Sequence, residues 1–189
     1  MEAVRKDKRY TYADYCTWDD GERWELIDGV AHAMSPGPSF EHQSVSGEIF
    51  SQLHAYLRGK QCKVFSAPFD VRLNAENGDD TVVQPDILVV CDRAKLEGGN
   101  GVTGAPDLII EILSPSTARH DRITKFNLYR QAGVREYWIV SPDDKSVVAH
   151  TLQDGRYWTH NYESSDSIPV QILDGCTITL AEVFENTII

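Results

Sequence analysis

The chain has 189 residues, enough to bury a hydrophobic core, and this length predicts one domain over residues 1–189. Its composition, 41% hydrophobic and 25% charged, is typical of a globular protein and excludes a disordered one. The formal charge of −11 argues against sequence-independent adhesion to nucleic acid or to anionic membranes.

The first predicted elements are short. After a basic tail at residues 1–9, Thr11 is expected to cap a short helix, and Asp28-Gly29 predicts a hairpin between two short strands. Residues 40–57 are predicted to form the first long helix. Wound at about 100° per residue, this segment places its apolar side chains on one stripe. The stripe consists of Val45, Ile49, Phe50, Leu53, Tyr56 and Leu57.

Strands dominate the remainder of the chain. The predicted strands are 62–66, 68–73, 82–90, 106–113 and 135–142, with further hairpins toward the C-terminus, one of them turning at Asp154-Gly155. A helix is expected over about residues 118–132, with N-cap candidates in the preceding Ser-Pro-Ser-Thr segment. Strands 82–90 and 106–113 are almost continuously apolar, which indicates a sheet covered on both faces. The predicted class is therefore α/β or α+β, with a central mixed sheet flanked by helices and extra hairpins near both ends.

Several familiar motifs are absent or misplaced. The segment GNGVTG at 99–104 matches a dinucleotide fingerprint, but a strand follows it instead of a helix, so we interpret it as a loop. Cysteines at 16, 62, 91 and 176 show no CxxC spacing, and we expect reduced thiols. The N-terminus lacks an apolar signal region, and no run approaches the roughly 20 apolar residues of a membrane span. A cytoplasmic location is expected.

Two carboxylates stand beside buried strands. Glu111 lies within the apolar run LIIEIL, where an ionised carboxylate is costly unless a cation or strong hydrogen bonds compensate it. Asp86 follows Pro85 and opens the run ILVV. Adjacent strands could present both acids to one point, where a divalent cation would relieve their repulsion. Alternatively, Asp86 is a turn residue and Glu111 an outward-facing edge residue.

Three further side chains are candidates for the same site. Lys125 falls on the core-facing stripe of the second helix, where Asp121 or the two carboxylates could compensate its charge; otherwise it is a snorkelling lysine. His42 lies on the apolar stripe of the first helix near its N-terminus, either as a functional group or as a satisfied core residue. Glu25 in the hairpin is a weaker candidate, because such residues are commonly solvated.

Together these residues resemble a known family. Pro85-Asp86, Glu111 and a nearby lysine look like the PD-(D/E)xK superfamily, which has the restriction endonuclease-like fold. The segments WELIDG, QPDILVV, EILSPST and GVREYWIV, with His42 and the Asp121/Lys125 pair, resemble the Uma-type family of endonucleases. In the superfamily pattern the lysine stands two residues after the acid, a position held here by Leu113, so Lys125 would be a migrated lysine.

The resemblance implies a metal-dependent endonuclease that hydrolyses phosphodiester bonds, with DNA as its expected substrate. It implies that Asp86, Glu111 and the carbonyl of Ile112 hold Mg²⁺, for which Mn²⁺ could substitute. Lys125 would orient or deprotonate the attacking water, and His42 and Glu25 would support the site from its rim.

The expected partners follow from the same resemblance. Arg119, Arg122 and Asp121 belong to a locally basic segment that adjoins the site and is predicted to contact the substrate. A homodimer would suit an enzyme that cuts both strands of a duplex. The alternative reading is a nuclease-like scaffold without catalytic activity that binds nucleic acid or protein.

Overall fold

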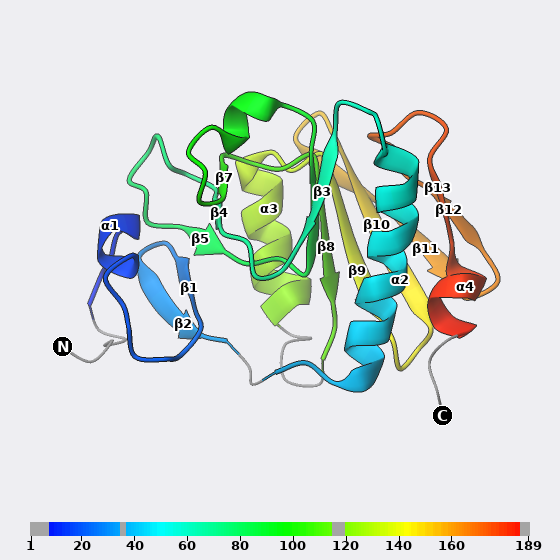
Figure 1. The fold of residues 1–189 in the computed structure, drawn as a ribbon, viewed down its shortest axis with the longest axis horizontal. Helices are drawn as coiled ribbons and strands as arrows, with labels where there is room; N and C mark the ends of the chain where they lie inside the picture. Colours follow the sequence, from blue (N-terminus) through cyan, green and yellow to red (C-terminus); the bar gives the residue numbers. More distant parts are fainter. Residues whose placement is uncertain (1–7, 35–36, 115–119, 186–189) are drawn as a thin grey trace.

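A computed structural model describes residues 8–34, 37–114 and 120–185, with side chains in the last range described from residue 123 onward. Figure 1 shows a mixed sheet with helices on both faces and a smaller, strand-rich region toward the N-terminus. The helical segments are α1 (Tyr12–Tyr15), α2 (Phe40–Leu57), η1 (Arg93–Leu96), η2 (His120–Lys125), α3 (Phe126–Ala132) and α4 (Leu180–Glu185). The segment η2 is a π-helical stretch that continues directly into α3.

The larger sheet has six strands in the order β11-β10-β9-β8-β6-β3. Its strands are β3 (Lys63–Ser66), β6 (Ile87–Val90), β8 (Leu108–Ile112), β9 (Glu136–Ser141), β10 (Ser146–Gln153) and β11 (Arg156–Glu163). Only the β8–β9 ladder is parallel within this sheet, so the predicted mixed sheet is confirmed. All residues of β6, β8 and β9 are buried, as expected for strands covered on both faces.

Two smaller sheets complete the fold. A five-stranded sheet has the order β2-β1-β5-β4-β7, and β12 pairs with β13. The strands are β1 (Trp24–Ile27), β2 (Val30–Ala33), β4 (Val71–Arg72), β5 (Val82–Val83), β7 (Val102–Thr103), β12 (Ser167–Pro169) and β13 (Thr177–Thr179). The predicted hairpin turns at Asp28-Gly29 and Asp154-Gly155 are confirmed, and all four residues adopt positive φ.

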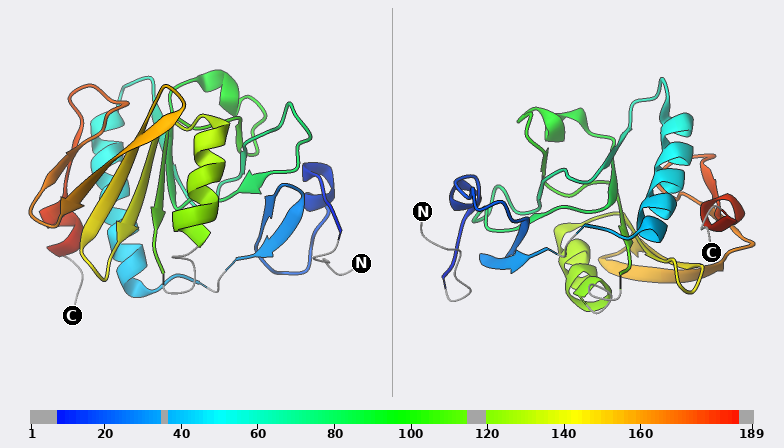
Figure 2. Two further views of the ribbon diagram at one scale, coloured as in Figure 1. Left: turned by 180° about the vertical axis from the view of Figure 1, so that it is seen from behind. Right: turned by 60° about the horizontal axis from the view of Figure 1, so that its bottom comes forward.

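Alternation along β8 separates two cores. Ile110 and Ile112 belong to the apolar cluster that contains the stripe of α2 together with α4. Ile109 and Leu113 belong to the cluster beneath α3, which also contains Tyr129. Figure 2 shows α2 and α3 on opposite faces of the large sheet. Glu111, between these residues, therefore faces α3. Among the helices that the structure describes, none has the length and apolar content of a bilayer span.

The run VVQPDILVV does not form one strand, contrary to our prediction. Val82–Val83 form β5 in the smaller sheet, whereas Ile87–Val90 form β6 in the larger one. The break falls at Gln84-Pro85-Asp86, because Pro85 has no N–H with which to continue a ladder. The chain thereby crosses between the two sheets beside Asp86.

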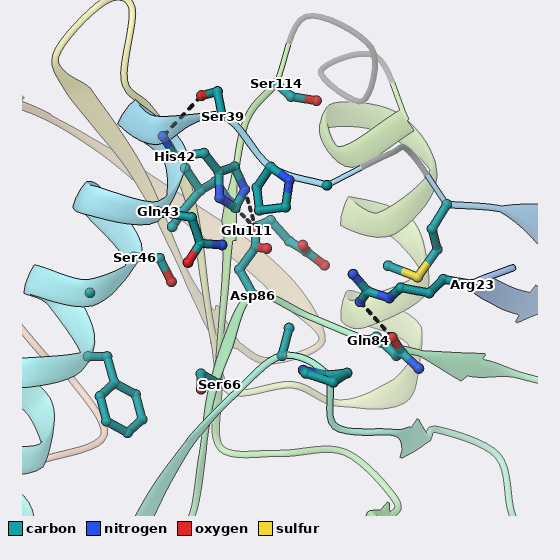
Figure 3. A pocket seen from close by; sticks show the side chains of 18 of the residues that line it. Arg23, Ser39, His42, Gln43, Ser46, Ser66, Gln84, Asp86, Glu111 and Ser114 are labelled. Carbon is teal, nitrogen blue, oxygen red and sulfur yellow. Dashed lines mark hydrogen bonds and ion pairs between the residues drawn. The ribbon is translucent and has the colours of Figure 1, made fainter. Parts of the chain in front are cut away.

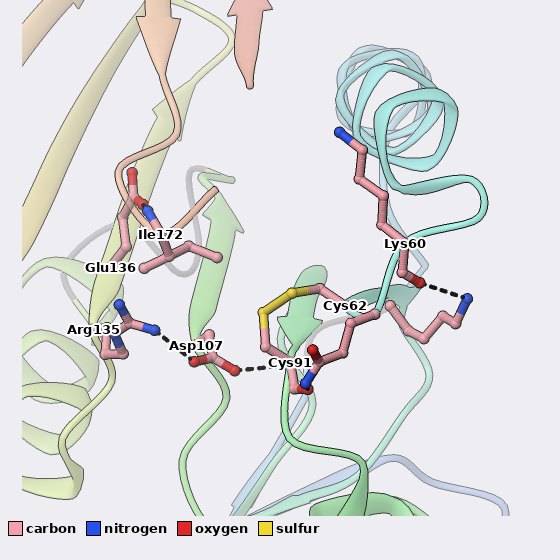
Figure 4. The surroundings of a disulfide bond; sticks show 9 residues. Lys60, Cys62, Cys91, Asp107, Arg135, Glu136 and Ile172 are labelled. Atoms are coloured by element: carbon pink, nitrogen blue, oxygen red, sulfur yellow. Dashed lines mark hydrogen bonds and ion pairs between the residues drawn. A yellow bond between two sulfur atoms is a disulfide. The ribbon is translucent and has the colours of Figure 1, made fainter. Parts of the chain in front are cut away.

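The prediction of four reduced cysteines is wrong for two of them. Cys62 and Cys91 form a disulfide with an S–S distance of 2.09 Å (Figure 4). They flank the antiparallel β3–β6 ladder, in which Lys63 is paired with Val90, so they face one another one position beyond it. A spacing of 29 residues along the chain gave no sign of this pairing. Cys16 and Cys176 are free thiols.

Candidate active site

A cleft of about 580 Å³ opens between the N-terminal half of α2 and the crossing from β5 to β6. Figure 3 shows His42 and Ser39 on its α2 side, Asp86 and Glu111 in its centre, and Arg23 and Gln84 on its far side. The 18-residue α2 begins here because Ser39 caps it, its side chain accepting a hydrogen bond from the backbone N–H of His42. The fold thus brings side chains from six separate segments to one opening: the β1–β2 hairpin, α2, residues 66–68, the crossing from β5 to β6, β8 and η2.

Glu111 on β8 and Asp86, directly before the neighbouring β6, lie across from each other. In the β6–β8 ladder Ile87 is paired with Ile110, and one step further along the same register Asp86 stands opposite Glu111. Both residues line the cleft. The Oδ2 atom of Asp86 accepts a hydrogen bond of 2.7 Å from the backbone N–H of Ile112, which fixes the carboxylate against β8.

Lys125 carries the buried charge that faces Glu111. Its ammonium nitrogen lies 3.0 Å from Oε1 of Glu111 and 3.0 Å from Oε1 of Glu25, and all three residues are at most 5% exposed. Glu25 also accepts a hydrogen bond of 3.1 Å from the backbone N–H of Gln84. Lys125 is therefore a buried lysine and not a snorkelling one. Glu25 is buried in contact with it, whereas a hairpin glutamate was expected to be solvated.

His42 lies beside the other carboxylate. Its Nε2 atom is 3.3 Å from Oδ2 of Asp86, and its side chain is 12% exposed. This contact places His42 in the wall of the cleft, within reach of an acid, and not in the apolar core beneath α2. The histidine can therefore orient Asp86, whose side chain remains 22% exposed to the cleft.

The sequence of this chain matches that of one family over most of its length. Residues 11–181 match Uma2, described as "Putative restriction endonuclease". The chain belongs to the Uma2 family. The predicted resemblance is therefore confirmed.

The Uma2 chain is similar to two proteins of Synechocystis sp. and to one solved structure from Anabaena variabilis. An uncharacterized protein of Synechocystis sp., slr1290, is 29% identical over 163 residues, covering 84% of this chain and 83% of the relative. A second, sll1609, is 26% identical over 163 residues, with coverages of 84% and 89%. A crystal structure described as "a putative nuclease belonging to DUF820" from Anabaena variabilis superposes with a TM-score of 0.75. It is 20% identical, covers 93% of this chain and 98% of its own, and shows that the fold is shared.

Sequence reasoning about the Uma2 chain missed Tyr129. This fully buried residue of α3 donates a hydrogen bond of 2.6 Å from its hydroxyl to Oε1 of Glu111, the same oxygen that faces Lys125. Burial, and then the charges of Glu111 and Glu25, raise the pKa of Tyr129 well above its usual range, so it remains a hydroxyl donor. A signal existed: Tyr129 follows Lys125 by four residues on the same predicted helical stripe.

The predicted substrate contacts remain predictions. Arg119 lies outside the described residues, and the side chains of Asp121 and Arg122 lie outside them as well. Arg23 lines the Uma2 cleft and is a further candidate for a substrate contact. The sequence analysis did not select this residue. Its signal was weak, because Arg23 precedes the WELIDG hairpin as one of several charged residues there.

Proposed function

We propose that this Uma2 protein is a Mg²⁺-dependent endonuclease that hydrolyses phosphodiester bonds of DNA. The observation that supports the proposal is the meeting of Asp86, Glu111 and Lys125 at one cleft, from the position before β6, from β8 and from the end of η2. Membership of the family described as "Putative restriction endonuclease" supports it independently. The expected Mn²⁺ substitution belongs to the same proposal.

The donor set suits a hard divalent cation. The carboxylates of Glu25, Asp86 and Glu111 outnumber the two cations, Lys125 and Arg23, which leaves a formal charge of −1 at the site. The carboxylates of Asp86 and Glu111 and the carbonyl of Ile112 are oxygen donors, and these three residues line the cleft. Within the described part of the chain, no three His, Cys, Asp or Glu side chains are grouped as a ready-made metal site. Mg²⁺ tolerates this, because it commonly binds one or two carboxylates and keeps several waters.

Mg²⁺ held by these three residues would lower the pKa of a water and polarise the scissile phosphate. The side chains around the proposed metal site contribute to catalysis by holding the charged groups in position. Two carboxylates at 3.0 Å favour the charged form of Lys125, which suits donation of a hydrogen bond to the attacking water or to a phosphoryl oxygen. Tyr129 and Glu25 hold this ammonium and Glu111 in one arrangement, and His42 and the N–H of Ile112 hold Asp86.

The alternative is a nuclease-like scaffold without catalytic activity. One observation favours it: Leu113, at the position where the superfamily pattern has its lysine, is 9% exposed and packs in the apolar cluster beneath α3. Lys125 weighs against it, because its ammonium contacts the acid that a strand lysine would adjoin. We therefore prefer the enzyme.

The proposal is tested by plasmid nicking with Mg²⁺ or Mn²⁺. Asp86→Asn and Glu111→Gln should abolish nicking and weaken Mn²⁺ binding measured by electron paramagnetic resonance. Glu97→Gln, which makes the same chemical change at an exposed position outside the cleft, should behave as the parent. A parent protein that cuts no DNA at any metal or salt concentration would favour the inactive scaffold.

We also propose that the protein forms a homodimer through β11. This eight-residue strand ends the large sheet, and within the described residues β10 is its only strand partner. Its outer edge therefore offers backbone N–H and C=O groups for pairing, and Trp158 on this strand is 60% exposed. An antiparallel β11 from a second copy would pair these groups and cover the indole.

A further inference from the structure

Arg23 is the accessible cation of the cleft. Among the described residues, Arg23 and Lys125 are the basic side chains that line it. The charge of Lys125 is offset by Glu25 and Glu111 at 3.0 Å. The exposed Arg23 side chain instead donates a hydrogen bond of 2.7 Å to Oε1 of Gln84, a neutral amide. Its positive charge therefore remains available to an incoming anion.

Gln84 is itself held in one orientation. Its Nε2 donates to Oδ1 of Asp70 at 2.8 Å and to the hydroxyl oxygen of Tyr15 at 3.1 Å. Because a carboxylate can only accept, the amino group of the amide must face Asp70, and the carbonyl oxygen is turned toward Arg23. Asp70 is in turn packed against the backbone of Gly101. A Cβ atom at position 101 would lie 2.5 Å from the Asp70 carbonyl oxygen, so only glycine allows this close approach.

The Arg23 side chain also points toward the two carboxylates of the cleft. Figure 3 shows Arg23 extending from the side opposite α2, with its guanidinium group toward Glu111 and Asp86. A guanidinium group binds a phosphate through charge and through two parallel hydrogen bonds, and one bond to Gln84 leaves further N–H groups for this purpose. On a chain with a formal charge of −11, a polyanion needs such a local cation to enter an acidic cleft.

We infer that Arg23, aimed by Gln84, is a binding site for a backbone phosphate of the nucleic acid. This inference rests on the proposed nuclease function and adds to it a substrate contact outside the segment of residues 119–122. The contact is to phosphate and not to a base edge, so it should act equally on all sequences.

The test is binding of a fluorescent phosphorothioate DNA duplex, which keeps the charge of each phosphate but resists hydrolysis. Affinity is measured by anisotropy over a series of salt concentrations at fixed Mg²⁺. We expect Arg23→Ala to weaken binding about tenfold, as for loss of one charge-assisted hydrogen-bonded contact. The slope of log K against log salt should become shallower by about 0.9, the value for one phosphate contact. Arg93→Ala, the same charge change on η1 outside the cleft, should alter neither quantity.

A second variant separates the effect of the orientation of the Arg23 side chain from the effect of its charge. Gln84→Ala removes the side-chain acceptor but keeps the backbone N–H that holds Glu25, so it should weaken binding while leaving the salt slope close to the parent value. If the parent binds DNA and Arg23→Ala binds it with unchanged affinity and slope, the phosphate site is wrong while the nuclease proposal stands. If the parent binds neither duplex DNA, single-stranded DNA nor RNA, both proposals fail.

Discussion

Lys125→Met should destabilise the folded protein strongly. The variant keeps most of the side-chain volume but removes the ammonium that lies 3.0 Å from both Glu25 and Glu111. The two glutamates are 5% and 4% exposed, so water compensates the lost cation poorly. Removing one partner of a buried ion pair costs about 3–5 kcal/mol, a large part of the roughly 5–15 kcal/mol that stabilises a typical domain. For a chain of this length, each kcal/mol lowers the melting temperature by about 2–4 °C.

The measurement is the free energy of unfolding in urea, followed by circular dichroism. Lys63→Met, at an exposed position of β3, is the matched control and should change little. Glu25→Gln combined with Lys125→Met should recover part of the loss, because it removes one of the two uncompensated buried charges. Equal stability of Lys125→Met and Lys63→Met would refute a buried charge cluster.

Three more outcomes are expected. Burial lowers the pKa of His150 to about 4 from 6.5, so the unfolded chain binds a proton in that window that the folded chain does not. The free energy of unfolding should fall by up to about 3 kcal/mol as pH drops through the window, and His150→Phe should reduce this fall; an unchanged pH profile would contradict it. The denatured protein should expose two thiols before reduction and four after it, and opening the Cys62–Cys91 loop should cost about 3–4 kcal/mol in urea unfolding; four thiols at the outset would exclude the disulfide. Trp158→Asp should convert the proposed dimer to a monomer in light scattering, and a parent that is monomeric at all concentrations would exclude the dimer.

Patterns within a single segment of the sequence were sufficient to predict the helices and strands whose apolar side chains pack against the cores. The predicted helix 40–57 agrees with α2 because its apolar stripe repeats with the helical period and Ser39 caps it. The apolar runs that contain β6 and β8 likewise indicated strands covered on both faces. The meeting of Asp86 with Glu111 followed from the assumption that their strands are neighbours, which the β6–β8 ladder fulfils.

Two other features that depend on contacts between distant segments could not be predicted. The Cys62–Cys91 pair depends on the β3–β6 register, and the burial of Glu25 depends on where the hairpin of β1 and β2 packs. Neither the spacing of cysteines nor the polarity of a hairpin residue carries that information. The break at Pro85 was readable in principle, since proline interrupts a ladder, but the apolar residues on both sides of it suggested one continuous strand.

If the protein is the nuclease proposed above, the position of Lys125 explains how a motif lysine can move along the chain while its ammonium stays beside the same acid. The proposed site would need an ammonium beside Glu111, on the face of β8 that looks toward α3. A lysine at position 113 would share that face, and a lysine at the junction of η2 and α3 approaches it from above the sheet. The second arrangement has a structural consequence. Because Tyr129 lies four residues further along, it reaches the same carboxylate oxygen as Lys125, so one helical segment supplies both the charge and the hydrogen bond that hold Glu111.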